Sequence, residues 1–328
     1  MAQKVRVGLI GCGGIAMGHI RNLMSIKDAE VAALMDPDDA RIATVRQQFP
    51  ALVNVPTFSD HKELIKNVEL DATVICSPHY AHCRQILDSL RAGLHVLTEK
   101  PMVCSVKDAH SVMKEEKKAG KLVAASYQRH CQGPFQFVRK ALQREEAGKV
   151  KFISAFQAQS WLHFTRGTWR QVKELSCGGQ LNDSGSHLID VVLWLTGLEP
   201  QEVFAHLDNC GTEVDVDSAV CVKFRGGAMA TFAVVGSAPV PWWEDLTIVC
   251  ERWSFFMRQG ELRVTTGLDG ETHRVEGFMY GSPSCDHNFV DAILGRAEVL
   301  APSICGLRTI ELTEAAWKSA ETGKPARV

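Results

Sequence analysis

A glycine-rich turn placed directly after a short apolar strand constrains this chain more than any other feature. Residues 5–10 read Val-Arg-Val-Gly-Leu-Ile, and they are followed by Gly11-x-Gly13-x-x-Ala16. Gly11 permits a tight turn, Gly13 lets a pyrophosphate approach the backbone, and the small Ala16 lets the next helix pack closely. The turn therefore predicts a dinucleotide at the N-terminus of that helix, where free N–H groups favour an anion. The predicted cofactor contacts in this turn are Gly11, Gly13, Gly14 and Ile15.

A carboxylate at the end of the second predicted strand indicates which dinucleotide binds. Asp36 follows that strand about 20 residues after the turn, where a carboxylate accepts hydrogen bonds from the adenosine ribose. Because Asp36 would repel a 2′-phosphate, NAD is preferred; Arg41, one turn into the next helix, could reach a phosphate, so NADP stays open. Asp38 fits a helix N-cap at least as well as a cofactor contact.

The first part of the chain alternates short β-branched runs with helical stretches, as βαβ units on a parallel sheet do. Strands are predicted at 5–10, 31–35, 72–76, 94–98 and 122–125, and helices near 15–27, 38–48, 79–92 and 105–119. We therefore predict an α/β fold whose N-terminal domain, residues 1–125, is a doubly wound Rossmann domain.

The alternation of strand-like and helical segments changes after residue 126. A helical segment over 132–147 leads into a long alternating strand over 149–161. Further strand-like runs lie at 201–208, 217–224, 228–235, 245–250 and 253–257, and short turns between them favour antiparallel neighbours. A second, α+β domain is expected over 126–328, with a final helix, 302–322, that could pack on either domain.

Charge and hydropathy exclude several classes of partner. The 328 residues contain 36 Lys and Arg against 38 Asp and Glu, a net charge of −2, which argues against nucleic acid and membrane-surface binding. No apolar run of about 18 residues could span a bilayer. A small-molecule partner is expected, and the start of the sequence, without a signal-like segment, favours a cytoplasmic protein.

A charged motif, Thr98-Glu99-Lys100-Pro101, follows the predicted strand 94–98. Ligands of α/β sheets bind at this carboxyl edge. Beside a positively charged nicotinamide, Lys100 would have a lowered pKa and could hold a substrate oxygen. A surface lysine before a helix is an equally open interpretation at this point.

A third motif contains Asp183, His187 and Asp190. If a helix begins at about Leu181, these residues share one face, and an imidazole between carboxylates can act as a general base. A structural cap or core histidine is the main alternative. A metal site is less well supported because further ligands are not evident, and no metal is predicted. A serine hydrolase is disfavoured because no G-x-S-x-G motif surrounds Ser184 or Ser186.

Together these motifs resemble the glucose-fructose oxidoreductase / inositol dehydrogenase / MocA (Gfo/Idh/MocA) family. The resemblance implies a Rossmann domain followed by an α/β domain with a large, mostly antiparallel, open sheet. It also implies NAD(P)-dependent oxidation of a secondary hydroxyl of a sugar or cyclitol, or the reverse reduction. In that family the matching residues have catalytic roles: Lys100 contacts substrate, His187 transfers the hydroxyl proton, and Asp183 assists it.

The resemblance adds further site positions. Cofactor contacts are implied at Ser77, Pro78, His82, Glu99 and Lys100, and substrate contacts at Lys100, Arg129, Trp169, Arg170, Asp183 and His187. His82 could instead cap or pack a helix, and Arg170 could pair with an acid.

The sequence is thus interpreted as an NAD-preferring sugar or polyol dehydrogenase, expected to be a homodimer or homotetramer. Two alternatives stay open: an NAD-dependent glycoside hydrolase that works by transient oxidation and elimination, and a catalytically silent NAD-binding sensor.

Overall fold

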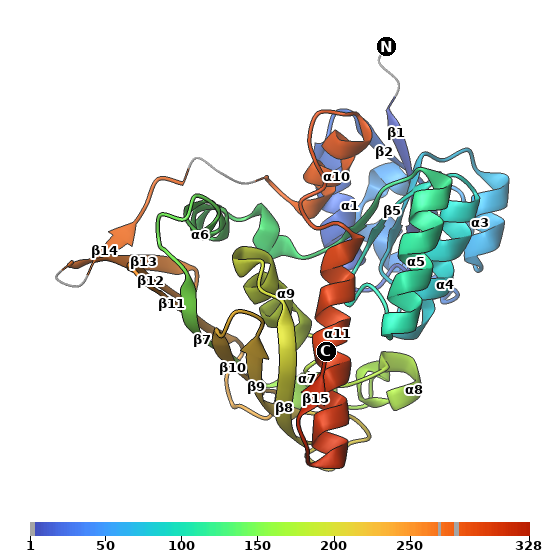
Figure 1. Cartoon of the computed structure of the whole chain (residues 1–328). Coiled ribbons are helices and arrows are strands. Elements are labelled where there is room, and N and C mark those ends of the chain that lie inside the picture. Colours follow the sequence, from blue (N-terminus) through green and yellow to red (C-terminus); the bar gives the residue numbers. More distant parts are fainter. Residues whose placement is uncertain (1–3, 268–269, 279–281) are drawn as a thin grey trace. The chain divides into compact units, whose positions relative to one another are not determined.

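The computed structural model describes residues 4–267, 270–278 and 282–328 (Figure 1). The chain forms two compact units. The first consists of Met1–Gln128 and Ser282–Gly306, and the second of Arg129–Gly281 and Leu307–Val328. Each unit is therefore built from two separate stretches of chain, whereas the sequence pattern indicated one boundary near residue 125.

A six-stranded parallel sheet with the order β3-β2-β1-β4-β5-β6 forms the centre of the first unit. Its strands are β1 (Val5–Ile10), β2 (Ala29–Met35), β3 (Thr57–Phe58), β4 (Ala72–Ile75), β5 (His95–Thr98) and β6 (Val123–Ala125). All five predicted strands are present, and β3 is too short to give a sequence pattern. This strand order is that of a doubly wound Rossmann domain, so the predicted fold class of the N-terminal part is confirmed.

Helices cover both faces of this sheet. They are α1 (Ala16–Ser25), α2 (Asp39–Gln48), η1 (Pro50–Leu52), α3 (His61–Asn67), α4 (His79–Arg91), α5 (Val106–Ala119) and α10 (Cys285–Ile293). Figure 1 shows α3, α4 and α5 on one side of the sheet and α1 with α10 on the other. Since α10 comes from the returning segment 282–306, the first unit is completed by residues far away in the sequence.

Local signals explain where two of these helices begin and end. The Asp38 side chain accepts a hydrogen bond from Ala40 N, so Asp38 is the N-cap of α2, one of the two roles the sequence left open. Ser105 caps α5 in the same way, and α5 ends at Gly120, whose φ of +62° a glycine adopts without strain.

The second unit is built on a nine-stranded sheet with the order β14-β13-β12-β11-β7-β10-β9-β8-β15. Its strands are β7 (Val150–Ala158), β8 (Pro200–Asp208), β9 (Asp217–Phe224), β10 (Met229–Val235), β11 (Trp243–Cys250), β12 (Trp253–Arg258), β13 (Glu261–Thr266), β14 (Thr272–Val275) and β15 (Ala326–Arg327). Among the described strands of this nine-stranded sheet, only β7 and β10 pair in parallel, which confirms a large, mostly antiparallel sheet. The strand predicted over 149–161 ends earlier, at Ala158.

The remaining helices are η2 (Gln128–Cys131), α6 (Gly133–Gln143), α7 (Trp161–Phe164), η3 (Trp169–Gln171), α8 (Lys173–Ser176), α9 (Gly185–Thr196) and α11 (Ser303–Thr322). In the second unit, α9 packs against α6 and against β7 and β10 of the sheet. Residues 185–195 of α9 are all buried, including its polar side chains. This helix starts at Gly185 and not near Leu181 as predicted, so Asp183 lies in the turn that precedes it.

Among the described residues, no helix combines the length and the apolar composition that crossing a bilayer requires.

Candidate functional site

The glycine-rich turn of the first unit presents open backbone at the start of α1. Gly11 has a φ of +91°, and a Cβ atom there would lie 2.7 Å from Ser77 N, so only glycine fits against the end of β4. A Cβ atom on Gly13 or Gly14 would meet nothing within 4 Å, and Ile15 is exposed. This open cradle of backbone at a helix N-terminus fits a pyrophosphate.

Asp36 is held beside this turn by two backbone donors. Its Oδ2 accepts a hydrogen bond from Cys12 N at 2.8 Å, and its Oδ1 accepts one from Asp38 N at 2.9 Å. Because each carboxylate oxygen can accept two hydrogen bonds, both oxygens keep capacity for ribose hydroxyls. The predicted carboxylate thus stands next to the turn in a fixed orientation.

His82 is buried in the first unit and contacts the loops that follow β4 and β5. Its Nδ1 is 2.8 Å from Pro101 O and its Nε2 is 2.9 Å from Ser77 O. Burial lowers the pKa of His82, and the neutral ring has one N–H with which to donate. Both nitrogens face backbone oxygens but only one can donate, so His82 hydrogen-bonds one loop and packs against the other, as in the packing role that the sequence left open.

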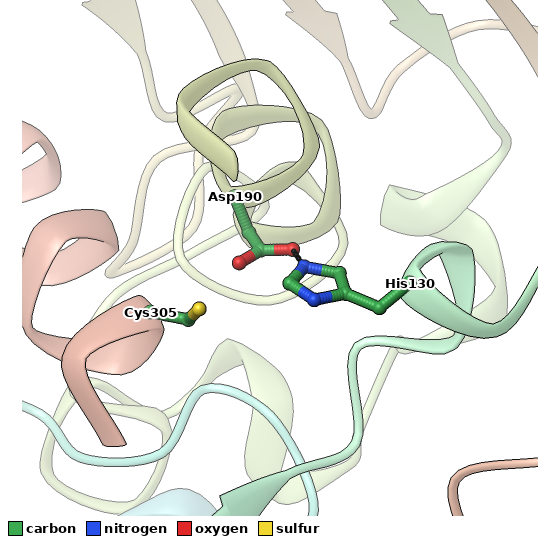
Figure 2. A group of neighbouring side chains, drawn as sticks. All are labelled: His130, Asp190 and Cys305. Carbon is green, nitrogen blue, oxygen red and sulfur yellow. Dashed lines mark hydrogen bonds and ion pairs between the residues drawn. The ribbon is translucent and has the colours of Figure 1, made fainter. Parts of the chain in front are cut away.

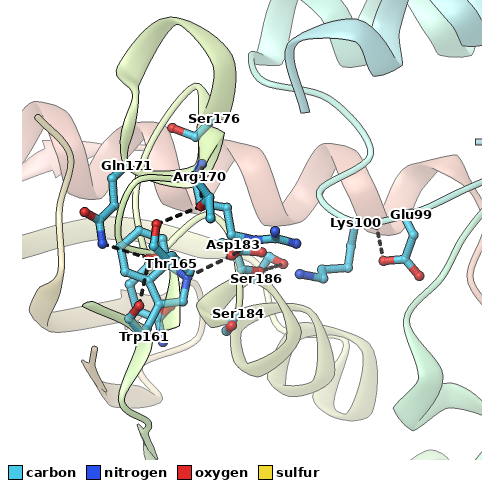
Figure 3. A network of polar contacts seen from close by, with 12 residues as sticks. Glu99, Lys100, Trp161, Thr165, Arg170, Gln171, Ser176, Asp183, Ser184 and Ser186 are labelled. Atoms are coloured by element: carbon cyan, nitrogen blue, oxygen red, sulfur yellow. Dashed lines mark hydrogen bonds and ion pairs between the residues drawn. The ribbon is translucent and has the colours of Figure 1, made fainter. Parts of the chain in front are cut away.

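Glu99, expected as a cofactor contact, also faces inward. Its Oε1 lies 3.1 Å from Nε2 of His19, and its Oε2 accepts a hydrogen bond from Lys100 N at 3.2 Å (Figure 3). Burial alone would raise the pKa of Glu99, but the hydrogen bond and charge of His19 and the charge of Lys100 lower it below its ordinary value. His19 in turn contacts Asp286 of α10. The sequence analysis missed both partners, because no spacing signal joins residues so far apart.

In the second unit, Asp183 is buried and its carboxylate is fixed by two donors. Trp161 Nε1 donates to Oδ2 at 2.8 Å, and Arg170 Nε donates to the same oxygen at 3.0 Å (Figure 3). The guanidinium of Arg170 also lies over the ring of Trp169, 4.4 Å from its centre. The structure thus brings three of the predicted positions together, and Trp161 adds a further donor to Asp183.

The loop that carries these donors is tied together by its own polar groups. Thr165 Oγ1 donates to Trp161 O, and Gln171 Nε2 donates to both Leu162 O and Thr165 Oγ1 (Figure 3). Thr168 caps η3, the turn that includes Trp169 and Arg170. The position of the Arg170 side chain is therefore set by an ordered loop.

His187 lies in the first turn of α9, one helical turn beyond Asp183, and is 8% exposed. Asp190 does not flank it as a second carboxylate in the way the helical spacing predicted. Its Oδ2 is 2.8 Å from His130 Nε2 (Figure 2). The ring of His130 also stacks on Trp194. Burial raises the pKa of Asp190, and the charge and hydrogen bond of His130 oppose this effect. Because α9 is buried on all sides, a neighbouring element, η2, supplies the partner of Asp190.

Arg129, expected to contact substrate, forms a bidentate ion pair. Its Nε donates to Glu244 Oε1 at 2.9 Å, and its Nη2 donates to Glu244 Oε2. The ring of Trp242 lies 5.7 Å from the guanidinium. The charge of Arg129 is thus largely neutralised within the second unit, and its first role is to connect η2 to β11.

A Rossmann domain followed by a mixed-sheet domain is the architecture of a family of NAD-binding oxidoreductases. The chain belongs to the GFO/IDH/MocA family. Residues 5–127 match the model described as "Oxidoreductase family, NAD-binding Rossmann fold", and residues 135–256 match the GFO/IDH/MocA C-terminal domain. The first unit is therefore an NAD-binding Rossmann domain, as predicted.

Similar proteins are sugar and cyclitol dehydrogenases. Myo-inositol 2-dehydrogenase of Thermotoga maritima is 28% identical over 234 residues, which are 69% of this chain and 66% of that protein. D-glucoside 3-dehydrogenase of Escherichia coli is 26% identical over 244 residues, 72% of this chain and 66% of that protein. The matched region thus spans just under two thirds of each relative.

Among solved structures, the WlbA dehydrogenase from Bordetella pertussis, in complex with NADH and UDP-GlcNAcA, has a TM-score of 0.88 at 22% identity. The match covers 100% of this chain and 99% of that chain. At this identity the likeness establishes the fold.

Proposed function

We propose that this chain is an NAD-dependent dehydrogenase that transfers a hydride between nicotinamide and a secondary hydroxyl, or the matching ketone, of a sugar, sugar derivative or cyclitol. The observation that carries the proposal is the Asp183 carboxylate, fixed by Trp161 and Arg170 in the turn that leads to His187. Similar proteins that are named as dehydrogenases of an inositol and of a glucoside, and the family membership of the chain, support the same class of reaction.

The proposed roles follow from side-chain chemistry. NAD supplies the hydride acceptor when bound. His187 takes the proton of the substrate hydroxyl as a general base, and the negative charge of Asp183 stabilises the imidazolium that results. Lys100 supplies a positive charge for the developing alkoxide. Asp36 and the open backbone at Gly13 favour NAD over NADP, because a 2′-phosphate would meet a carboxylate.

Two buried amides of the second unit have polar atoms that are unpaired within the described part of the chain, which a polyhydroxylated substrate would reach only when neighbouring side chains move aside. Both polar side-chain atoms of Gln157, on β7, and of Asn182, next to Asp183, have no hydrogen-bond partner among the described residues. Buried amides are normally bonded, and leaving one unpaired costs about 1–3 kcal/mol. Sugar hydroxyls both donate and accept, so they match an amide that offers two donors and an acceptor.

The outer face of the nine-stranded sheet supports the expected homo-oligomer. Phe152 and Met229 are neighbours on paired strands and are both exposed, and Cys221 lies on the same face. An exposed apolar face of this kind commonly marks an interface. Sedimentation velocity should show a dimer or tetramer, and a monomer at micromolar concentration would contradict this part of the proposal. The cytoplasmic location stays a prediction.

The proposed function is tested by NADH formation with NAD, and separately with NADP, across neutral sugars, sugar acids, cyclitols and aryl glycosides. We expect NADH to accumulate with one polyol class, and His187→Ala to lose turnover far more than NAD affinity. Release of the aglycone from a glycoside without net NADH would instead identify the redox-cycling hydrolase. Equal losses of turnover and NAD affinity in His187→Ala would refute the role of the histidine.

A further inference from the structure

The first unit contains a buried histidine, His19, between two carboxylates. Its Nδ1 lies 2.7 Å from Asp286 Oδ1, and its Nε2 lies 3.1 Å from Glu99 Oε1. The side chains of these three residues are only 6%, 2% and 8% exposed. Asn22 Nδ2 donates to the second oxygen of Asp286 at 2.7 Å. The three side chains are therefore almost completely shielded from solvent, and each ring nitrogen of His19 has a carboxylate partner.

A carboxylate at each ring nitrogen favours the charged form of His19. Ionised carboxylates only accept, so both ring nitrogens of His19 must carry a proton to donate to Asp286 and Glu99. Burial disfavours the charged ring, but the charges and hydrogen bonds of Asp286 and Glu99 outweigh burial and raise the pKa of His19 to about 10. His19 is therefore an imidazolium throughout the physiological pH range.

The imidazolium joins three separate segments of the first unit. It lies on α1, the helix that follows the glycine-rich turn. Glu99 lies at the end of β5 and accepts a hydrogen bond from the backbone N–H of Lys100 through its second oxygen. Asp286 lies on α10, in the segment that returns to this unit near the end of the chain. His19 thus connects the dinucleotide-binding helix to the backbone of Lys100.

We propose that His19 is a positioning residue: it holds the Glu99 carboxylate, and through Glu99 it fixes the backbone at Lys100 so that the lysine is correctly placed for substrate. The role of Lys100 comes from the proposed function, so the inference rests on it in that one respect. Neither the glycine motif nor the Glu-Lys-Pro motif identifies His19 on its own.

Several ionisable groups surround His19, including the two carboxylates that bond to it. They are Glu99, Lys100, Asp286, Cys76, His82 and, through Ser284, His287. Burial, followed by the charges of Glu99 and Asp286, raises the pKa of Cys76, so this thiol stays neutral.

Removing the imidazolium changes which of these groups titrates. Glu99 would then be a buried carboxylate beside Asp286, and burial and charge repulsion both favour its protonation. We expect its pKa to rise above the lowered value that it has beside the imidazolium. A protonated Glu99 is a poorer acceptor for the Lys100 N–H, so the position of Lys100 becomes dependent on pH.

The test compares His19→Gln with His61→Gln as a matched control. His61 is another buried histidine of the first unit. It is the first residue of α3, and its Nε2 lies 3.0 Å from Oδ2 of Asp88 on α4. Two measurements are made across pH: the kcat and KM of the dehydrogenase with its best substrate, and the backbone amide chemical shift of Lys100 by ¹H–¹⁵N NMR.

In His19→Gln we expect kcat/KM to fall at least about tenfold at low pH with a new ionisation, while the Kd for NAD changes less than about threefold. The Lys100 amide should titrate with the same midpoint. In the parent chain and in His61→Gln, neither change should occur. If His19→Gln does not fold, Glu99→Gln replaces it, and it should show the same loss at every pH.

The two measurements separate the two proposals. A Lys100 amide that titrates in His19→Gln, in a chain that turns over no polyol, would refute the proposed function and leave the His19 linkage standing. A Lys100 amide that behaves as in His61→Gln overturns the inference, whatever the activity.

Discussion

The stability of the folded chain should fall at alkaline pH because His19 gives up its proton. In the folded chain its pKa is about 10, against 6.5 when unperturbed. The stabilisation is fully present below the unfolded value of 6.5, and it is lost as the pH rises toward 10, because the unfolded chain has already released this proton. One proton corresponds to about 1.4 kcal/mol per pH unit, so the free energy of unfolding should drop by about 2 kcal/mol between about pH 8 and about pH 9.5.

Urea unfolding at several pH values measures this loss. Cysteines such as Cys12, whose pKa burial raises to about 12, titrate alike in the parent chain and in a variant, so their effects cancel. The parent chain should therefore lose about 2 kcal/mol more than His19→Gln over this interval, whereas His61→Gln should follow the parent. Equal slopes in the parent and in His19→Gln would mean that the buried ring is not an imidazolium, and would refute the reasoning.

Three further predictions concern candidate residues of the two units. Trp161→Phe removes one of the two donors to Asp183 and should lower kcat at least about tenfold at saturating NAD, since a hydrogen bond to a charged group contributes about 1.5–3 kcal/mol; an unchanged kcat would contradict this role. Asp36→Ala should reduce the preference for NAD over NADP at least about tenfold, measured as the ratio of kcat/KM values, and a retained ratio would exclude the ribose contact. Gln157→Leu should raise the free energy of unfolding by about 1–3 kcal/mol and also raise the KM for the sugar; lower stability would show that the amide is satisfied in the free protein.

The sequence predicts the Rossmann sheet well because its signals are local. The glycine turn, the caps and the β-branched runs each act within a few residues, and they place β1, β2, β4, β5 and β6 correctly. The helix α10 carries no comparable signal. It belongs to the first unit because Asp286 meets His19 and Asn22 across more than half of the chain, a contact that only the folded chain creates.

The sequence suggested candidate residues in the second unit, but it did not indicate their hydrogen-bond partners. Periodicity placed Asp183, His187 and Asp190 on one helical face, but a helix that is buried on all sides has no single functional face. Asp190 meets His130 of η2, and Asp183, two residues before the helix, receives donors from the loop that contains Trp161 and Arg170. Tertiary packing decides both pairings, so spacing alone could not.

The surroundings of the Glu-Lys-Pro motif show how the charged side chains of His19, Glu99 and Asp286 can be buried next to Lys100. Of its neighbours, His19 and Lys100 carry positive charges, and Glu99 and Asp286 carry negative charges, so the four sum to zero. His82 supports the same loop from the other side, and burial together with the charge of Lys100 lowers its pKa. A neutral His82 preserves the balance, whereas a charged one would leave an uncompensated positive charge in the interior. The two histidines thus differ in protonation because their partners differ: carboxylates face His19, whereas backbone carbonyl groups face the buried His82.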